Sequence, residues 1–360
     1  NKVFYRIGRV MKIKDKKIAV LGSGANGSSV GADLTDAGLD VTIIDQWPAH
    51  VETMKENGLD IKMPDKHLQI PVNAWHLCEL AEHVPAFDVV FLVVKSYDTR
   101  WMTQLIEPYL KEDGVFIGLQ NGMNNETISD VVGVERTIGA VVELSAEIFT
   151  PGIVKRDTTR PGTWFGLGEL DGTITPRLEM VKEIMENVAT ITLTENVEGA
   201  KWTKLICNTM TMGPIGLTGL KNWDARKLPG MFDMAVALGR ESMTVGKALG
   251  YEMQPVFGMT AEEFSGASDE ILIKAMEALM NHVGKEGVTA PIHDHIKGRK
   301  SEMSLINGIV ASKGEELGIP VTCNAAVTEI DRRINEKEIE MDVSNFGLLK
   351  SMVESLPNRA

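Results

Sequence analysis

The chain has 360 residues, of which 43% are hydrophobic and 24% are charged. This length allows two domains of ordinary size, and the composition is typical of a globular chain rather than a disordered one. The formal net charge of −13 argues against nucleic acid and anionic membranes as partners, because either would require a basic face. We also recognise no signal peptide and no apolar segment of membrane-spanning length.

The three cysteines, Cys78, Cys207 and Cys323, are widely spaced and match no metal-binding pattern. Such cysteines are typical of reduced thiols in a reducing compartment, so we expect a cytoplasmic protein. Residues 1–16 are basic and show no clear period, and we assign them no function.

The first predicted element is a strand over residues 17–21 that leads directly into a glycine motif. Gly22, Gly24 and Gly27 follow the pattern G-x-G-x-x-G in the order strand, tight turn and helix start. Gly22 permits the turn, Gly24 lets a pyrophosphate approach the backbone, and Gly27 lets the helix pack close to the strand. The helix N-terminus then faces the phosphates. The predicted cofactor-binding residues of this loop are Gly22, Ser23, Gly24, Ala25, Asn26 and Gly27.

The second predicted strand, over residues 41–45, ends in Asp45, which lies 23 residues after Gly22. A Rossmann unit places at about this distance the carboxylate that binds the adenosine ribose. A carboxylate repels a 2′-phosphate and accepts from a 2′-hydroxyl, so Asp45 favours NAD(H), while NADP(H) stays possible. A glycine-rich turn without a ligand is the alternative, but the strand before it and the acid after it favour a dinucleotide site.

Short apolar runs alternate with helical patterns through the first half, which is typical of βαβ units and a mostly parallel sheet. The predicted strands are 17–21, 41–45, 89–94, 115–119 and 137–142, and the predicted helices are 26–37, 49–57, 98–110 and 125–131. The runs 152–154 and 163–166 predict a β-hairpin added to the edge of this sheet.

From about residue 196 the strand-like runs stop and long amphipathic segments follow. The predicted helices are 197–212, 231–249, 268–282, 301–317 and 325–337. We therefore predict a dinucleotide-binding α/β domain over 17–195 and an all-α domain over 196–360. The active site is expected where the carboxyl ends of the strands face the helices.

Lys95 and Asn121 each follow a predicted strand at its carboxyl end, where open α/β sheets bind ligands. Asn121 precedes Gly122, and Asn-Gly marks a tight turn, so Asn121 is either a turn residue alone or an amide near the nicotinamide and the substrate. The repeated placement at strand ends favours the second. Lys95 remains either a functional lysine or an ordinary surface lysine.

Lys204 and Asn208 lie four residues apart on the predicted helix 197–212 and so share a face, which continues to Met212. Apolar neighbours suggest a partly buried site, and burial lowers the pKa of a lysine toward the range that suits proton transfer near neutral pH. The spacing alone fits an exposed lysine on an amphipathic helix better, so the residues themselves leave this choice open.

Glu302 lies just before an apolar helical run, with Ser301 as a potential N-cap. An early glutamate either stabilises the helix N-terminus through its dipole or accepts from a substrate hydroxyl and partners a lysine. His293 and His295 are too close together for a helical two-histidine site and no fourth ligand is evident, so we predict no metal.

Taken in order, these motifs resemble the ketopantoate reductase (2-dehydropantoate 2-reductase) family over nearly the whole chain after residue 16. The family pattern is a glycine-rich loop, a strand-end lysine, an Asn-Gly turn, a helix with W-x-K-L-x-x-N, and a late G-R-x-S/T-E followed by I-N-G. This chain carries the glycine loop at 22–27, Lys95, Asn121-Gly122, W-x-K-L-x-x-N at 202–208, and G-R-x-S-E at 298–302, with I-N-G at 306–308.

The resemblance implies a Rossmann domain followed by a helical domain of the 6-phosphogluconate dehydrogenase-like type, which binds substrate and forms a homodimer. It also implies hydride transfer from a nicotinamide cofactor to a 2-keto acid, with Lys204 as the general acid. Glu302 would hold the substrate and help to position Lys204. By the same resemblance, the residues that bind the substrate would be Asn121, Asn208 and Asn222. Lys95 and Asn121 would line the junction of cofactor and substrate.

This chain departs from the family pattern at three positions that concern the substrate. Met212 stands where the family helix has a second asparagine, and Gly287 and Ala290 stand where an asparagine and a serine hold the substrate carboxylate. The expected pocket is therefore more apolar than a ketopantoate site. Ketopantoate is the first candidate substrate, and the alternative is an NAD-dependent D-2-hydroxyacid dehydrogenase for a bulkier or more apolar 2-keto acid.

A dinucleotide-binding sensor that has lost catalysis is a hypothesis of a different class. The retention of Lys204, Asn208 and Glu302 argues against it, since a sensor need not keep a proton donor. A nucleotide-sugar dehydrogenase would require a nucleophilic cysteine, and Cys207 points away from the face of Lys204.

Overall fold

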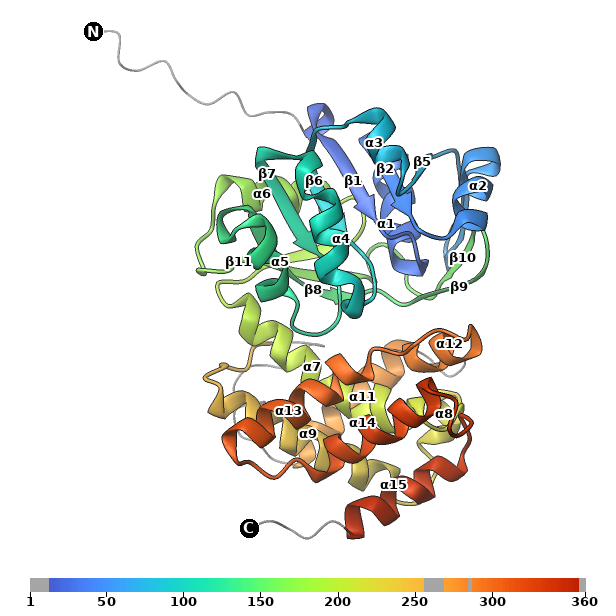
Figure 1. Cartoon of the computed structure of the whole chain (residues 1–360), viewed down its shortest axis with the longest axis vertical. Helices are drawn as coiled ribbons and strands as arrows, with labels where there is room; N and C mark the ends of the chain where they lie inside the picture. Colours follow the sequence, from blue (N-terminus) through green and yellow to red (C-terminus); the bar gives the residue numbers. More distant parts are fainter. Residues whose placement is uncertain (1–12, 256–268, 284–286, 356–360) are drawn as a thin grey trace, which may run out of the picture. The chain divides into compact units, whose positions relative to one another are not determined.

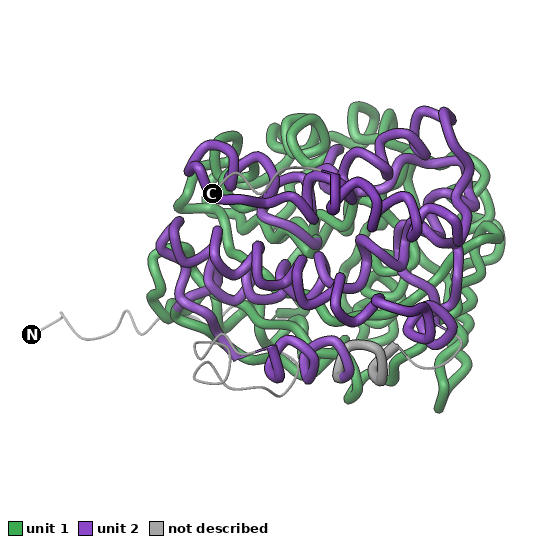
Figure 2. The backbone as a smooth tube through the Cα atoms, turned by 90° about the horizontal axis from the view of Figure 1, so that it is seen from below, with its two compact units in different colours: residues 1–94, 98–120, 125–195 green, residues 95–97, 121–124, 196–360 purple. Residues whose placement is uncertain are grey.

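The structure is a computed structural model that describes residues 13–255, 269–283 and 287–355 (Figure 1). Its described residues divide into two compact units (Figure 2). The first unit holds the chain up to residue 94 together with 98–120 and 125–195. The second holds the chain from residue 196 onward, and it also takes up the short segments 95–97 and 121–124.

The first unit alternates strands and helices, as its sequence pattern predicts. In the described residues its elements are β1 (Lys17–Leu21), α1 (Ala25–Asp36), β2 (Asp40–Asp45), α2 (Pro48–Asn57), β3 (Leu59–Lys62), β4 (His67–Ile70), β5 (Asn73–His76), α3 (Glu79–His83), β6 (Phe87–Leu92), α4 (Thr99–Ile106), β7 (Leu110–Gly118), α5 (Asn125–Val132), β8 (Thr137–Glu143), β9 (Ala146–Thr150), β10 (Ile153–Arg156), β11 (Trp164–Glu169), α6 (Pro176–Met185) and β12 (Thr190–Leu193).

The described strands of this unit form an eight-stranded sheet with the order β12-β11-β8-β7-β6-β1-β2-β5. All neighbouring pairs are parallel except β8 and β11, so the predicted, mostly parallel sheet is confirmed. Side chains of β1 alternate between its two faces: Ile18 and Val20 join a core with α1 and α6, and Ala19 and Leu21 join a core with α3, α4 and α5. The sheet is thus covered by helices on both sides.

The predicted β-hairpin of 152–154 with 163–166 is wrong. β10 pairs instead with β9 and β3 in a second sheet of order β4-β3-β10-β9, and β11 joins the main sheet antiparallel to β8. Arg156 at the end of β10 accounts for the difference. Its guanidinium is fully buried and donates to Asp33 of α1, which fixes β10 against that helix.

The second unit is all-helical in its described residues, as predicted. Its helices are α7 (Val197–Gly216), α8 (Asn222–Ala225), α9 (Met231–Ala248), α11 (Asp269–Val283), α12 (Ala290–Ile296), α13 (Asn307–Leu317), α14 (Thr322–Asn335) and α15 (Ser344–Ser355). No helix in the described part of the chain is both long enough and apolar enough to cross a membrane.

α7 lies at the centre of this unit, packed against α9, α11, α12 and α14. Its first turn is capped by Asn196, whose side chain accepts from the backbone N–H of Gly199 at 2.8 Å. Trp202 is 1% exposed, stacks on Tyr251, and donates from Nε1 to the carbonyl of Ser242 on α9 at 3.0 Å. These contacts set the rotation of α7 and hence the face that Lys204 and Asn208 occupy.

The predicted helix over 301–317 is shorter than expected. A 3₁₀ turn over Met303–Leu305 precedes α13, which begins only at Asn307, and Ser301 does not cap it. The Ser301 hydroxyl instead donates to the carboxylate of Asp331 on α14 at 2.6 Å. This tertiary hydrogen bond draws the segment before α13 out of the helical path.

Candidate active site

The glycine loop follows β1 and has the geometry that its sequence predicts. Gly22 has φ +93°, and a Cβ there would lie 2.5 Å from Val94 Cγ1 and 2.9 Å from a backbone oxygen. A Cβ on Gly27 would lie 1.9 Å from the carbonyl oxygen of Gly22. Gly24, directly before α1, has no atom within 4 Å of such a position. The fold itself therefore requires Gly22 and Gly27, whereas Gly24 leaves open space beside the N-terminus of α1.

Asp45 lies at the end of β2 and is buried against this loop. Its carboxylate accepts from the backbone N–H of Ser23 and from that of Trp47, the latter at 2.7 Å. The Ser23 hydroxyl is buried and has no hydrogen-bond partner among the described residues. An open Gly24, a buried hydroxyl and a carboxylate at the end of β2 together fit the pyrophosphate and ribose of a dinucleotide.

His50 of α2 supports the loop from behind and was not found by sequence reasoning. Gly152 donates its backbone N–H to His50 Nδ1 at 2.9 Å, so Nε2 carries the proton and faces Ser28 Oγ at 3.1 Å. The Ser28 hydroxyl in turn donates to the carbonyl of Ser23 at 2.7 Å. His50 and Ser28 belong to no sequence motif, so nothing in the sequence marks this connection.

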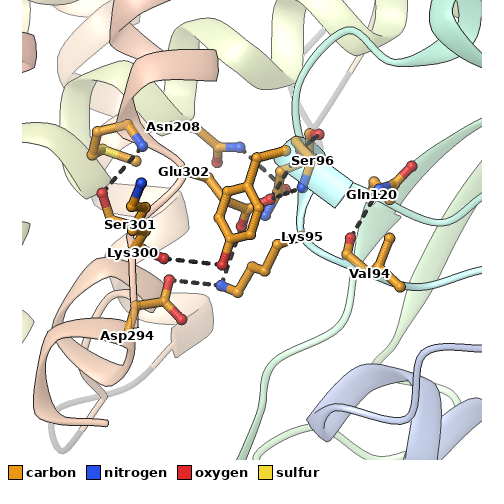
Figure 3. A network of polar contacts seen from close by, with 12 residues as sticks. Val94, Lys95, Ser96, Gln120, Asn208, Asp294, Lys300, Ser301 and Glu302 are labelled. Atoms are coloured by element: carbon orange, nitrogen blue, oxygen red, sulfur yellow. Dashed lines mark hydrogen bonds and ion pairs between the residues drawn. The ribbon is translucent and has the colours of Figure 1, made fainter. Parts of the chain in front are cut away.

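Lys95 forms the centre of a charged cluster in the second unit (Figure 3). Its ammonium lies 2.7 Å from Asp294 Oδ2 and 3.2 Å from Glu302 Oε2. The other oxygen of Glu302 accepts from the backbone N–H of Ser96 at 2.7 Å and from its hydroxyl at 2.9 Å. The Lys95 side chain is 31% exposed and the two carboxylates are 5% and 7% exposed, so the cluster is largely buried.

The cluster shifts the proton affinities of its members. Burial alone would lower the pKa of Lys95, but the charges of Glu302 and Asp294 outweigh it and raise that pKa above its ordinary value. Burial raises the pKa of Asp294, against the opposing effect of Lys95. Lys95 is therefore a permanent cation here, suited to binding an anion or fixing carboxylates rather than to releasing a proton.

A pair of amides lies in the same unit. Asn208 of α7 donates from Nδ2 to Asn121 Oδ1 at 3.2 Å. The carbonyl of Asn121 accepts from the Ser96 hydroxyl at 3.0 Å and from Asn124 Nδ2 at 2.7 Å. Since Ser96 also contacts Glu302, these hydrogen bonds connect the amide pair with the charged cluster.

Lys204 lies on α7, one turn before Asn208, and is half-buried. One turn further back, Lys201 is buried at 4% exposure, and burial lowers its pKa to about 8, opposed by the charge of Glu198. Asn222 begins α8, is buried, and donates its backbone N–H to the carbonyl of Gly287 at 3.0 Å. In the described part of the chain, this hydrogen bond joins Asn222 to Gly287, outside the Lys95 cluster.

The structure thus brings together four residues that the sequence singled out: Lys95, Glu302, Asn121 and Asn208. Asp294 and Ser96 complete this group, although the sequence analysis assigns neither of them a role. The position of Ser96 directly after Lys95 was the one available signal. In the described part of the chain, no group of three or more His, Cys, Asp or Glu residues is arranged to hold a metal.

Comparison with known proteins identifies the family of this chain. The family model described as "Ketopantoate reductase PanE/ApbA" matches residues 18–169, and that described as "Ketopantoate reductase PanE/ApbA C terminal" matches residues 196–335. The chain belongs to the ketopantoate reductase family. This family is one of oxidoreductases, so the predicted enzyme class is confirmed at that level.

One curated relative is the 2-dehydropantoate 2-reductase of Archaeoglobus fulgidus, 26% identical over 89% of this chain and 98% of the relative. Among solved structures, a D-mandelate dehydrogenase with NADH and anilino(oxo)acetate has a TM-score of 0.79 at 22% identity, covering 89% of this chain and 99% of that one. A ketopantoate reductase family protein from Ralstonia eutropha JMP134 has a TM-score of 0.75 at 24% identity, covering 89% and 99%. The two structures share the fold of this chain.

Proposed function

We propose that this chain is an NADH-dependent reductase that transfers hydride to the keto group of a 2-keto acid. One observation carries the proposal: the Lys95 ammonium, the carboxylates of Asp294 and Glu302, and the amides of Asn121 and Asn208 gather in one unit. Convergent charges and amides of this kind suit a small anionic substrate with a carbonyl or hydroxyl group. The glycine loop of the first unit supplies the dinucleotide site.

We assign the proton donor to Lys204. A reduced nicotinamide supplies the hydride, and the keto oxygen gains negative charge as its carbon receives it. An ammonium group near that oxygen stabilises the charge and then donates a proton. Lys204 is half-buried on the face of α7 that carries Asn208, and Glu302 would accept a hydrogen bond from the substrate hydroxyl. Lys95 is poorly suited to donate because its partners raise its pKa.

The second candidate function is a D-2-hydroxyacid dehydrogenase for a bulky or apolar 2-keto acid. Met212 lies one turn after Asn208 on α7 and is buried, so this helix face continues with a thioether where the family has an amide. Gly287 and Ala290 carry no polar side chain. The D-mandelate dehydrogenase with the same fold, which binds NADH and anilino(oxo)acetate, is a precedent for such a substrate.

The proposed preference for NADH rests on Asp45. Its carboxylate lies at the end of β2, where the ribose would bind, and it accepts from two backbone N–H groups. An anion there repels a 2′-phosphate and accepts from a 2′-hydroxyl. A homodimer in the cytoplasm, which the sequence analysis expects, remains part of the proposal, and light scattering on the purified protein tests the dimer.

A substrate panel tests the reaction. The purified chain is assayed with ketopantoate, 2-ketoisovalerate, phenylglyoxylate and pyruvate, each with NADH and NADPH. We expect turnover of at least one acid, with NADH preferred, and a loss in kcat of about 10²- to 10⁴-fold in Lys204→Ala at unchanged NADH affinity. Lys201→Met serves as the companion variant, since it removes the neighbouring lysine of the same helix. An absence of turnover on every acid, with NADH still bound, would contradict the proposal and favour a sensor.

A further inference from the structure

A second network of hydrogen bonds lies in the same unit and centres on Asp331 of α14, which is 2% exposed. Its Oδ2 accepts from the Ser301 hydroxyl at 2.6 Å and from Asn335 Nδ2 at 2.7 Å, and its Oδ1 accepts from His295 Nε2 at 3.2 Å. The side chain of His295 is 6% exposed. Asp331 is thus a buried carboxylate with donors from three places in the chain.

Two of these donors are chain neighbours of the carboxylates that hold Lys95. His295 directly follows Asp294 in α12, and Ser301 directly precedes Glu302. Residues 297–300, which lie between them, are mostly exposed. The turn after α12 is closed by backbone hydrogen bonds, including one from the Arg299 N–H to the carbonyl of Asp294 at 2.8 Å, and the link then continues to Ser301 without regular structure. Asp331 is the group that binds both of its ends.

The segment before Glu302 has further anchors on α14. The Ser301 backbone N–H donates to Asn335 Oδ1 at 3.0 Å, and the Ser301 hydroxyl accepts from the N–H of Met303 at 3.3 Å. Ser301 is 3% exposed. Glu302 therefore follows directly after a residue that is bound through both its backbone and its side chain.

This arrangement has a consequence for the charged cluster. Lys95 contacts Asp294 and Glu302 at 2.7 and 3.2 Å, and a shift of about 1 Å in either carboxylate would break a hydrogen bond. A buried carboxylate costs free energy unless it is well hydrogen-bonded, and Asp331 has three donors. When the residues next to an active site have all their hydrogen bonds made, they fix the geometry of the active-site groups.

We propose that Asp331 is a positioning residue of the active site, which holds Asp294 and Glu302 at the distance that Lys95 requires. This inference rests on the proposed function, which makes the Lys95 cluster part of an active site. The contacts of Asp331 themselves do not depend on which substrate binds. Asp331 acts through Ser301 and His295 and touches no reacting atom.

Asp331→Asn is the first test variant, because it keeps the size of the side chain and removes its charge and one acceptor. We expect kcat/KM for the 2-keto acid to fall about 10- to 100-fold, with the KM for NADH unchanged. Ser301→Ala and His295→Gln, which each cut one of the two links, should cause smaller losses. The loss from Ser301→Ala should largely disappear in the Asp331→Asn background, because both act on one link.

Glu241→Gln is the matched control. Glu241 of α9 is also a largely buried carboxylate bound to α14, where it accepts from the backbone N–H groups of Cys323 and Asn324 at 2.8 and 2.9 Å. In the described part of the chain, the hydrogen bonds of Glu241 all run to Cys323 and Asn324, away from the segment that carries the cluster. If Asp331 acts only by stabilising α14, then Glu241→Gln and Asp331→Asn should lower kcat/KM equally wherever they lower the Tm equally. We expect the control to lower the Tm and leave kcat/KM unchanged.

A second measurement needs no turnover. Acylation of lysines by a water-soluble ester, read by mass spectrometry, should be slow at Lys95 in the wild type, because its carboxylate partners keep it protonated. In Asp331→Asn and Ser301→Ala the rate at Lys95 should rise relative to that at exposed Lys227, and in Glu241→Gln it should not.

The outcomes separate this inference from the proposed function. If no 2-keto acid is turned over but Lys95 labels faster in Asp331→Asn, the proposed function fails and the positioning role stands. If Asp331→Asn changes neither the labelling of Lys95 nor kcat/KM beyond the effect of Glu241→Gln, Asp331 is only structural and the inference is overturned.

Discussion

The two candidate sites of this molecule are built by different means. The glycine loop of the first unit lies within residues 22–27, and its geometry is set by backbone, with Gly22 at positive φ and Gly27 packed on its carbonyl. The charged cluster of the second unit is set by side chains, and Lys95 lies 199 and 207 positions from its partners Asp294 and Glu302. A site of the first kind can be recognised from local sequence, whereas one of the second kind depends on the whole fold.

The largest expected effect tests the side-chain site. Glu302→Gln should reduce kcat about 10²- to 10³-fold, because the amide cannot both accept from Ser96 and balance the charge of Lys95. Steady-state kinetics measures it. Glu329→Gln on α14 is the matched control: its exposed carboxylate pairs with Arg332 and should be dispensable. Equal activity of the two variants would show that the cluster has no part in turnover.

The buried Lys201 predicts a pH dependence of stability. Its pKa is about 8 in the folded chain against 10.5 ordinarily, so between these pH values the unfolded state binds a proton that the native state lacks. Stability should therefore rise with pH across this window, by at most about 3 kcal/mol from this group. Denaturant unfolding of wild type and Lys201→Met measures the difference. Lys201→Met should have a larger free energy of unfolding than the wild type at pH 7 and should not gain stability between pH 8 and 10.5. Identical pH dependence of the two proteins would contradict the lowered pKa of Lys201.

Two glycine substitutions test the glycine loop, and we expect one to reduce stability and the other to reduce NADH binding. Gly27→Ala should destabilise the protein by about 2 kcal/mol or more, because the added Cβ overlaps the carbonyl of Gly22. Gly24→Ala has free space in the protein and should leave the Tm unchanged while weakening NADH binding, because the methyl group obstructs the pyrophosphate. Calorimetric unfolding and titration with NADH distinguish them. If Gly24→Ala bound NADH as tightly as the wild type, the dinucleotide would not bind at this loop.

The smallest expected effect concerns the choice of cofactor. Asp45→Asn should raise the KM for NADH about tenfold and narrow the preference for NADH over NADPH, because the amide does not repel a 2′-phosphate. Initial rates with both cofactors measure it. A wild-type enzyme that prefers NADPH would contradict the role given to Asp45.

The main sheet could be predicted from the sequence because its strands are strongly apolar and regularly spaced. β1 has the predicted bounds, and β2 begins one residue earlier than predicted. The second sheet could not be predicted in this way. Its strands β3 and β4 have four residues each, and five of these eight are exposed or partly exposed. β10 is placed by the buried pair of Arg156 and Asp33. That pair joins residues 123 positions apart, which no local pattern reports.

The candidate site was accessible from the sequence only in part, and mainly through motifs. Strand-end placement identified Lys95 and Asn121, and the family pattern added Glu302. Of the partners that give these groups their chemistry, Ser96 is marked only by its position directly after Lys95, and Asp294 only by its position between the two histidines. The sequence predicts Ser301 as a potential helix cap because its hydroxyl precedes an apolar run, yet the acceptor of this hydroxyl lies 30 positions away on α14.

Deuterium transfer from NADH is a direct test of the proposed hydride transfer and of the role of Lys204. The chain is incubated with NADH that carries deuterium at the transferable position of C4 and with the 2-keto acid that it reduces, and the product is analysed by mass spectrometry and NMR. We expect one deuterium at C2 of the hydroxy acid, and its rate of appearance should fall sharply in Lys204→Ala although NADH still binds. Bound NADH that never passes its deuterium to a 2-keto acid, or an unchanged rate in Lys204→Ala, would contradict the proposal.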